Sequence, residues 1–166
     1  MIELTEDELI KCKEFAEIVT KNTVKRYKER NPLANTDKII QDHYLAKLSE
    51  IAVYRHLIAN NRDASYPSFK LEYDQSEDCD IYINGATRNI RLHCKVCRDD
   101  SRVKDSWLIQ ANSVPKLDED DYFALCRFKA PNNIEILKII SSQDIIWKPT
   151  KIYMPSKLAC YYVDMI

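Results

Sequence analysis

One glycine in 166 residues is the strongest constraint on what this chain can fold into. Gly85 follows Asn84 and separates two short segments rich in β-branched and aromatic residues, 80–83 (DIYI) and 90–97 (IRLHCKVC). An Asn-Gly pair between such segments is typical of the turn of a β-hairpin. Loops that cradle phosphates in nucleotide-binding folds need several glycines, so the sequence argues against those folds and against a nucleotide cofactor.

The composition fits one folded domain without a membrane partner. With 45% hydrophobic residues, the chain can bury roughly two-thirds of its unfolded surface. The 26 acidic and 25 basic residues nearly balance, so the net charge neither indicates nor excludes a polyanionic partner. No segment reaches the roughly 20 apolar residues of a membrane helix, and the charged N-terminus is unlike a signal peptide. We therefore expect a soluble, cytoplasmic protein.

The six cysteines are spread through the chain, several of them in apolar segments. This usage is typical of buried thiols in a reducing compartment rather than of a disulfide framework. Cys94 and Cys97 have the spacing of a zinc-binding pair, but on one strand they point to opposite faces. The sequence therefore argues against structural zinc.

Cap residues and helical spacing predict two helices at the start of the chain. Thr5 and Glu8 have the spacing of a capping box, ahead of a helix that ends near Pro32. A second helix, over residues 35–61, begins at an Asn-Thr-Asp run and is largely buried, because apolar residues cover most of its surface.

Short segments with alternating, β-branched or aromatic residues predict the strands. They are residues 69–73, 80–83, 90–97, 121–129 and 134–141. We expect residues 103–114 to be helical or irregular, residues 142–148 to form a short helix, and residues 160–166 to form a last edge strand. This order predicts an α+β fold, an α/β sandwich whose central mixed sheet is flanked by helices, in a single domain over residues 1–166.

Charged side chains interrupt the predicted hairpin. Alternate residues of a strand share a face, so Arg91, His93 and Lys95 lie together. Asp80 opens the partner strand at a similar distance from the turn, so we expect it near Lys95. On the second helix, Glu50 projects from a mainly apolar face, where an unpaired carboxylate is costly.

Two explanations are open for these residues. In the first, they are structural: Lys47 or a tyrosine hydroxyl is the partner of Glu50, and Lys95 protects a strand edge. In the second, two carboxylates bind Mg²⁺ or Mn²⁺, which prefer oxygen ligands. A neighbouring lysine would then orient the attacking water and offset charge on a phosphate. That set of groups suits hydrolysis of a phosphodiester.

These residues resemble the PD-(D/E)XK nuclease superfamily, the restriction-endonuclease-like proteins. The resemblance rests on KLSEIAVYRHL, DCDIYING and IRLHCKVC, which follow the family's order of helix, strand, hairpin and strand. It covers roughly residues 37–140 and implies a nuclease-like core there, between an N-terminal helix in residues 1–36 and a C-terminal extension in residues 141–166. It also implies a metal-dependent DNA endonuclease.

The resemblance implies that Asp80 and Glu50 bind Mg²⁺ or Mn²⁺ and that Lys95 is the catalytic lysine. The chain departs from the family at His93, where the motif has Asp or Glu two residues before the lysine. An imidazole binds Mn²⁺ better than Mg²⁺, and it can also carry protons. His93 is then either a third metal ligand and catalytic residue, or the mark of a degraded site in a nucleic-acid-binding or assembly module.

A DNA substrate also requires side chains that bind phosphates or bases. The candidates near the hairpin and after it are Arg91, Arg98, Arg102, Lys104 and Gln110. Small members of the superfamily usually act on both strands as dimers, so the resemblance implies a homodimer. The size of the chain suits a homing, repair, restriction or phage-type nuclease.

Overall fold

Two long helices form at the start of the chain, as predicted. The structure, a computed structural model, describes residues 1–30, 32, 35–71, 79–101, 103, 105–151, 154 and 156–165. Strand β1 (Ile2–Glu3) precedes helix α1 (Glu6–Arg30), and helix α2 (Thr36–Ala59) follows. Neither helix, over the ranges described, has an apolar stretch sufficient to cross a membrane.

Both helices begin at side-chain caps, which confirms the predicted starts. The Thr5 N–H donates to Glu8 Oε2 at 2.8 Å, and the Glu8 N–H donates back to Thr5 Oγ1 at 3.3 Å. At the start of α2, the Lys38 N–H donates to Asn35 Oδ1 at 2.8 Å. These bonds satisfy backbone donors that have no partner within the helix.

A mixed five-stranded sheet in the order β1-β6-β5-β3-β2 forms the centre of the fold. Its longer strands are β2 (Ile81–Ile83), β3 (Ile90–Arg98), β5 (Asp121–Lys129) and β6 (Asn133–Ser141). β3 is antiparallel to β2 and parallel to β5, and β5 is antiparallel to β6. The α+β fold with a central mixed sheet is therefore confirmed, and these four strands lie close to their predicted bounds.

The Asn84-Gly85 pair lies in the loop that joins β2 to β3, as predicted. A Cβ atom on Gly85 would lie 2.3 Å from the backbone carbonyl oxygen of Arg88. The φ of Gly85 is not positive, so this close approach of the backbone is what requires glycine here.

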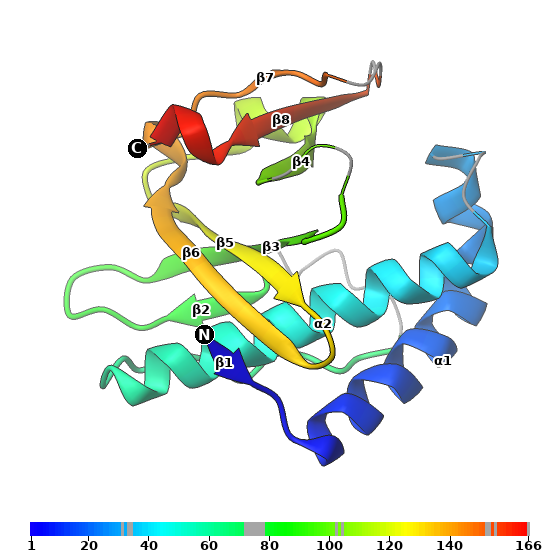
Figure 1. Ribbon diagram of the computed structural model, residues 1–166. Helices are drawn as coiled ribbons and strands as arrows, with labels where there is room; N and C mark the ends of the chain where they lie inside the picture. Colours follow the sequence, from blue (N-terminus) through cyan, green and yellow to red (C-terminus); the bar gives the residue numbers. More distant parts are fainter. Residues whose placement is uncertain are drawn as a thin grey trace.

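A second sheet of three strands, in the order β4-β8-β7, covers the face of the main sheet opposite the helices (Figure 1). Its strands are β4 (Ser106–Gln110), β7 (Lys148–Pro149) and β8 (Lys157–Tyr161). β8 lies in the middle and pairs with β4 and β7. The predicted C-terminal extension therefore supplies two strands of this second sheet.

The expectation that residues 103–114 are helical or irregular is wrong for β4. Trp107 and Ile109 point inward and are buried, whereas Leu108 between them is 36% exposed. This alternation is the strand period, but a five-residue segment is too short for the period to distinguish a strand from a helix by sequence alone. Only Ala111–Lys116 forms a helix, of the 3-10 type.

Three other segments also differ from prediction. β8 ends at Tyr161, and a 3-10 helix over Tyr162–Met165 replaces the expected edge strand. The expected helix over residues 142–148 is limited to Ser142–Asp144. Residues 69–71 form no strand, and the rest of that expected strand lies outside the described residues.

The main sheet separates two hydrophobic cores. The core beneath α2 includes Leu48, Ile51, Leu92 and Cys94. The core between the sheets includes Trp107, Phe123, Leu125 and Cys160. Because neighbouring residues of a strand point to opposite faces, β3 and β5 contribute to both cores.

All six cysteines are free thiols, and each except Cys79 is buried. Cys94 packs in the core beneath α2, whereas Cys97 packs in the core between the sheets. The two thiols therefore lie on opposite faces of β3, as predicted, and do not form a zinc pair.

We expect Trp107→Phe to lower the free energy of unfolding by about 1–3 kcal/mol. The indole Nε1–H donates to the Cys126 carbonyl at 2.8 Å in the buried core, and phenylalanine leaves that carbonyl without its partner. Urea unfolding followed by circular dichroism measures the change. The matched control is Leu108→Ala on the exposed side of the same strand, which should change stability by less than about 0.5 kcal/mol. Equal effects of the two variants would contradict the prediction.

Candidate functional site

Asp80 lies where β2 separates from β3. Its N–H donates to the Leu92 carbonyl at 3.1 Å, which continues the antiparallel pairing by one residue. Its carboxylate oxygen Oδ2 accepts from the Cys94 N–H at 2.7 Å. The structure therefore brings Asp80 beside the part of β3 that carries His93 and Lys95.

Glu50 is buried on α2 and forms an ion pair with Lys47, one turn earlier. The Lys47 ammonium group also donates to the Ser68 carbonyl at 2.6 Å and lies 4.7 Å from the centre of the Phe15 ring. Lys47 is itself only 7% exposed, so a buried cation lies beside the buried acid. This is the structural partner that the sequence offers for Glu50.

The electrostatic surroundings of Glu50 include two further predicted site residues. Burial raises the pKa of the Glu50 carboxyl to about 8, and the charge of Asp80 raises it as well. The charges of Lys47 and Lys95 act in the opposite direction. The charges of Asp80 and Lys95 therefore both act on Glu50, although Asp80 precedes β2 and Lys95 projects from the face of β3 turned away from the core beneath α2.

Lys95 lies on the face of β3 that looks toward the second sheet. It shares that face with His93 and Cys97, and its charge also acts on Cys160 of β8. Within the described ranges, the Lys95 ammonium group has no hydrogen bond or ion pair. Its charge is therefore available to an anion.

His93 is bound to the neighbouring strand. Its Nε2 lies 2.9 Å from Asp121 Oδ1, and its ring stacks on Phe123 with centroids 5.0 Å apart. A carboxylate only accepts hydrogen bonds, so the Nε2 proton is donated to Asp121. The contacts of His93 that the structure describes are thus with β5, and they do not place it between Asp80 and Glu50.

Asp121, which sequence reasoning missed, is the centre of this network. Arg91 donates two hydrogen bonds to its carboxylate, both at 3.0 Å, and also contacts Asp118 at 2.6 Å. Asp121 stands opposite Arg91 in the parallel pairing of β3 with β5. Sequence alone shows a run of four acidic residues, 118–121, without showing which one turns inward.

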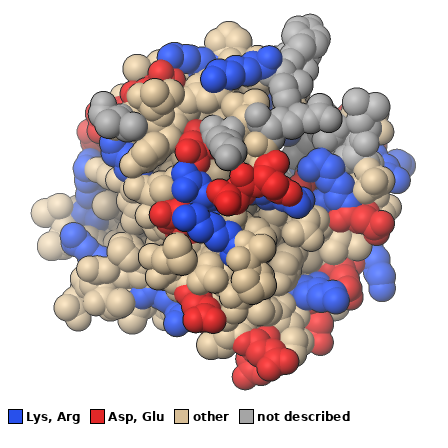
Figure 2. Space-filling model, viewed as in Figure 1, with Lys and Arg blue, Asp and Glu red and all other residues tan. Residues whose placement is uncertain are grey.

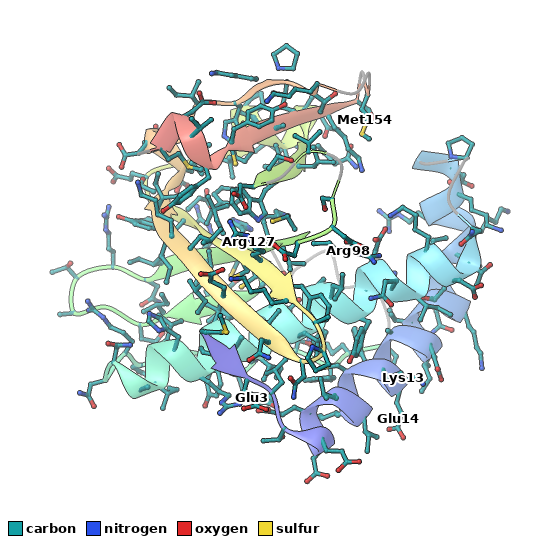
Figure 3. The ribbon with its side chains drawn as sticks, viewed as in Figure 1. Glu3, Lys13, Glu14, Arg98, Arg127 and Met154 are labelled. Carbon is teal, nitrogen blue, oxygen red and sulfur yellow. The ribbon has the colours of Figure 1, made fainter. Side chains whose placement is uncertain are left out.

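The predicted DNA-binding residues have different surroundings. Arg91 is paired with Asp121, and Arg98 donates two hydrogen bonds to Asp100, at 2.9 and 3.0 Å. In Figure 2, basic and acidic side chains lie side by side in the middle of the viewed face, where Figure 3 labels Arg98. Arg102 and Lys104 lie outside the described residues. Gln110, the last residue of β4, stands opposite Lys157 of β8.

The donor set suits Mg²⁺ or Mn²⁺ better than a metal that needs a protein cage. No group of three or more His, Cys, Asp and Glu side chains in the described part of the chain is arranged to hold a metal ion. Mg²⁺ is usually bound by one or two carboxylates together with waters and substrate phosphates. Asp80 and Glu50 are ligands of that chemical type, whereas the described contacts of His93 are with Asp121 and Phe123.

Comparison with protein-family models finds no match, and comparison with curated proteins finds no significant match. Neither result bears on the resemblance drawn from the hairpin motif.

We expect Asp121→Asn to lower the free energy of unfolding by about 2 kcal/mol at pH 7. Below pH 4, the free energy of unfolding of this variant should depend less on pH than that of the unchanged protein. Burial alone would raise the pKa of Asp121, but hydrogen bonds from Arg91, from the Asp118 N–H and from His93 lower it to about 2. The ionised carboxylate therefore stabilises the fold above pH 4, and this contribution is lost as the pH falls toward 2.

Urea unfolding at pH 7, 4 and 2.5 measures this effect. The matched control is Asp100→Asn, which breaks the exposed ion pair with Arg98 and should cost less than about 1 kcal/mol. The same loss of stability on acidification in Asp121→Asn and in the unchanged protein would show that the network does not stabilise the fold.

Proposed function

We propose that the protein is a divalent-metal-dependent endonuclease that hydrolyses phosphodiester bonds of DNA. The observation that carries this proposal is the buried Glu50 carboxyl, which is coupled to the charges of both Asp80 and Lys95. Two carboxylates close together disfavour ionisation of both, and a divalent cation bound to them relieves that repulsion. The Lys95 ammonium group, which has no hydrogen bond or ion pair in the described ranges, adds the cation that a phosphate needs beside two carboxylates and their metal ion.

Asp80 and Glu50 would hold Mg²⁺ or Mn²⁺. A metal ion bound there would lower the pKa of a bound water and neutralise charge on the phosphate. Asp80 Oδ2 is oriented by the Cys94 N–H, which fixes the direction of the other carboxylate oxygen, Oδ1. Lys95 would offset the charge that develops on the phosphate oxygens during attack.

Lys47 has a separate role in this proposal. Its ammonium group, held by the Ser68 carbonyl and the Phe15 ring, favours the ionised form of Glu50 when no metal is bound. A buried carboxylate with no cation nearby would be strongly destabilising. Lys47 therefore allows the acid to be kept in the interior at all.

A second candidate function is a nucleic-acid-binding or assembly module with a degraded site. Two observations favour it: His93 stands in the acid position of the motif and is bound to Asp121, and Glu50 already has Lys47 as a partner. The protein would then have the fold and the hairpin of a nuclease but would not hydrolyse phosphodiesters.

The proposal extends to partners and compartment. Since one site cuts one strand, we propose that two copies of the chain act together on duplex DNA. Free thiols at all six cysteines support a reducing compartment, and we propose the cytoplasm.

We expect Asp80→Asn and Lys95→Met each to lower metal-dependent DNA cleavage by about 100-fold or more. Asparagine still accepts the Cys94 N–H bond but carries no charge, and methionine keeps the apolar stem of the lysine without its ammonium group. The assay is nicking and linearisation of supercoiled plasmid in Mg²⁺ or Mn²⁺, with EDTA as the blank. Glu14→Gln, which changes an exposed acid on α1, is the matched control and should cleave like the unchanged protein.

Cleavage that survives both substitutions equally would point to a contaminating nuclease and reject the proposal. Binding of DNA in a gel shift with EDTA, together with no cleavage in either metal, would favour the binding module instead.

We expect His93→Gln to change the cleavage rate by no more than about threefold. Glutamine can donate from its side-chain nitrogen to Asp121 but lacks the imidazole that would bind a transition metal or carry a proton. The rate is measured in Mg²⁺ and in Mn²⁺ separately. If His93→Gln lowered the cleavage rate more than tenfold without changing urea unfolding, His93 would have to take part in the reaction.

A further inference from the structure

The chain between α2 and β2 includes an irregular segment, residues 63–71, that lies along the helical layer (Figure 1). Its start is fixed to the outer edge of β2, where the Ser65 N–H donates to the Tyr82 carbonyl and the Tyr82 N–H donates to Ser65 Oγ, both at 2.8 Å. Its far end reaches α1, where the Asn22 side-chain amide donates to the Leu71 carbonyl at 3.1 Å. The segment therefore spans from the edge of the main sheet to the first helix.

Between these two ends, ring contacts hold the segment on the helices. The Phe69 ring packs edge-on against Phe15 of α1, with ring centroids 5.3 Å apart, and stacks on the Tyr66 ring at 6.2 Å. Tyr66 in turn contacts Tyr54 of α2 edge-on at 5.0 Å. The Lys11 ammonium group of α1 lies 4.2 Å from the centre of the Phe69 ring, which is a cation–π contact. A ladder of four aromatic rings thus fastens the segment to both helices.

The inner side of this segment covers the ion pair of Lys47 and Glu50. The Lys47 ammonium group donates to the Ser68 carbonyl at 2.6 Å and lies 5.2 Å from the centre of the Phe69 ring. The Phe15 ring, at 4.7 Å, completes its surroundings from α1. Lys47 is 7% exposed and Glu50 is 8% exposed. Lys47 thus occupies one side of the Glu50 carboxylate, and another cation can take its place only when the segment moves.

Side chains rather than backbone pairing hold the covering part of the segment. Among the hydrogen bonds that join backbone groups of described residues, none involves residues 66–70. Segments without such pairing open at a lower free-energy cost than strands and helices. The backbone pairing at Ser65 is a fixed end about which the segment can move. The ring ladder therefore decides how often Glu50 is uncovered.

We propose that residues 63–70 form a latch, which in its closed state keeps Lys47 on Glu50 and excludes a divalent cation from this carboxylate. In the open state Lys47 loses its contacts with the segment, and Glu50 becomes available beside Asp80. The latch sets the fraction of molecules that can bind metal, and the apparent metal affinity follows that fraction. This inference rests on the proposed function, which makes Glu50 a metal ligand.

We expect Phe69→Leu to raise the rate at which an amine-reactive ester labels Lys47 by about fivefold. Leucine keeps the apolar bulk but offers no ring face to the ammonium groups of Lys11 and Lys47, so the open state becomes more populated. Labelling in metal-free buffer is followed by peptide mass spectrometry, and it reports the open fraction because the closed state buries Lys47. The apparent Kd for Mn²⁺, measured by calorimetry without DNA, should fall by the same factor.

Matched variants separate the latch from general loss of packing. Phe128→Leu makes the same change at a partly buried ring of β5 in the core beneath α2, and it should leave labelling and Mn²⁺ affinity unchanged. Lys11→Met leaves the core intact, because Lys11 is exposed and contacts the segment from outside. It should change both quantities about twofold in the direction of Phe69→Leu. Lys13→Met, at an exposed lysine of α1 labelled in Figure 3, should change neither.

The outcomes distinguish the latch from the function on which it rests. Equal labelling of Lys47 in Phe69→Leu and in the unchanged protein would overturn the latch, as would faster labelling without tighter Mn²⁺ binding. If DNA cleavage still needed Asp80 and Lys95, either result would reject the latch alone. Faster labelling and tighter Mn²⁺ binding in Phe69→Leu, without cleavage by the unchanged protein, would support the latch and reject the nuclease. Absence of Mn²⁺ binding in both proteins would overturn both.

Discussion

The parallel pairing of β3 with β5 is the constraint on which the rest of the structure depends. Parallel neighbours cannot be joined by a tight turn, so the chain must leave the sheet after β3 and return at the opposite end. The segment between β3 and β5 forms β4 and the 3-10 helix Ala111–Lys116, and β4 pairs with β8. The same register sets Arg91 against Asp121, which holds His93. One strand pairing thus accounts for the second sheet, the second core and the surroundings of the motif histidine.

Features that depend on neighbouring residues could be predicted from the sequence, and features that depend on distant pairing could not. The caps, the hairpin and four of the expected strands are local patterns, and they appeared close to their expected places, whereas residues 69–71 form no strand and β4 was not expected. The partner of Glu50 could be predicted because Lys47 lies one helical turn away on the same helix. Asp121 was missed because only the β3–β5 register singles it out from its acidic neighbours. The central position of β8 was missed for the same reason, since β4 is far from it in sequence.

Two lysines, Lys47 and Lys95, act on the buried Glu50 carboxyl, and their surroundings differ. Lys47 is fixed by a carbonyl and aromatic rings, so it behaves as part of the scaffold. Lys95 has no such anchor in the part of the chain that the structure describes, and it faces the space between the two sheets. A chain that only needed to bury Glu50 would have no use for the second lysine. One anchored cation and one unanchored cation therefore act on the same buried acid.

The close approach at Gly85 has a consequence for how this chain can vary. Surface loops normally accept substitutions, because their side chains extend into solvent. At Gly85 any side chain begins with a Cβ against the backbone oxygen of Arg88, and backbone cannot move aside as a flexible side chain would. An exposed position is therefore closed to every other amino acid, as a packed interior site would be. Among relatives of this chain, the glycine of the hairpin loop should be retained while the residues around it vary.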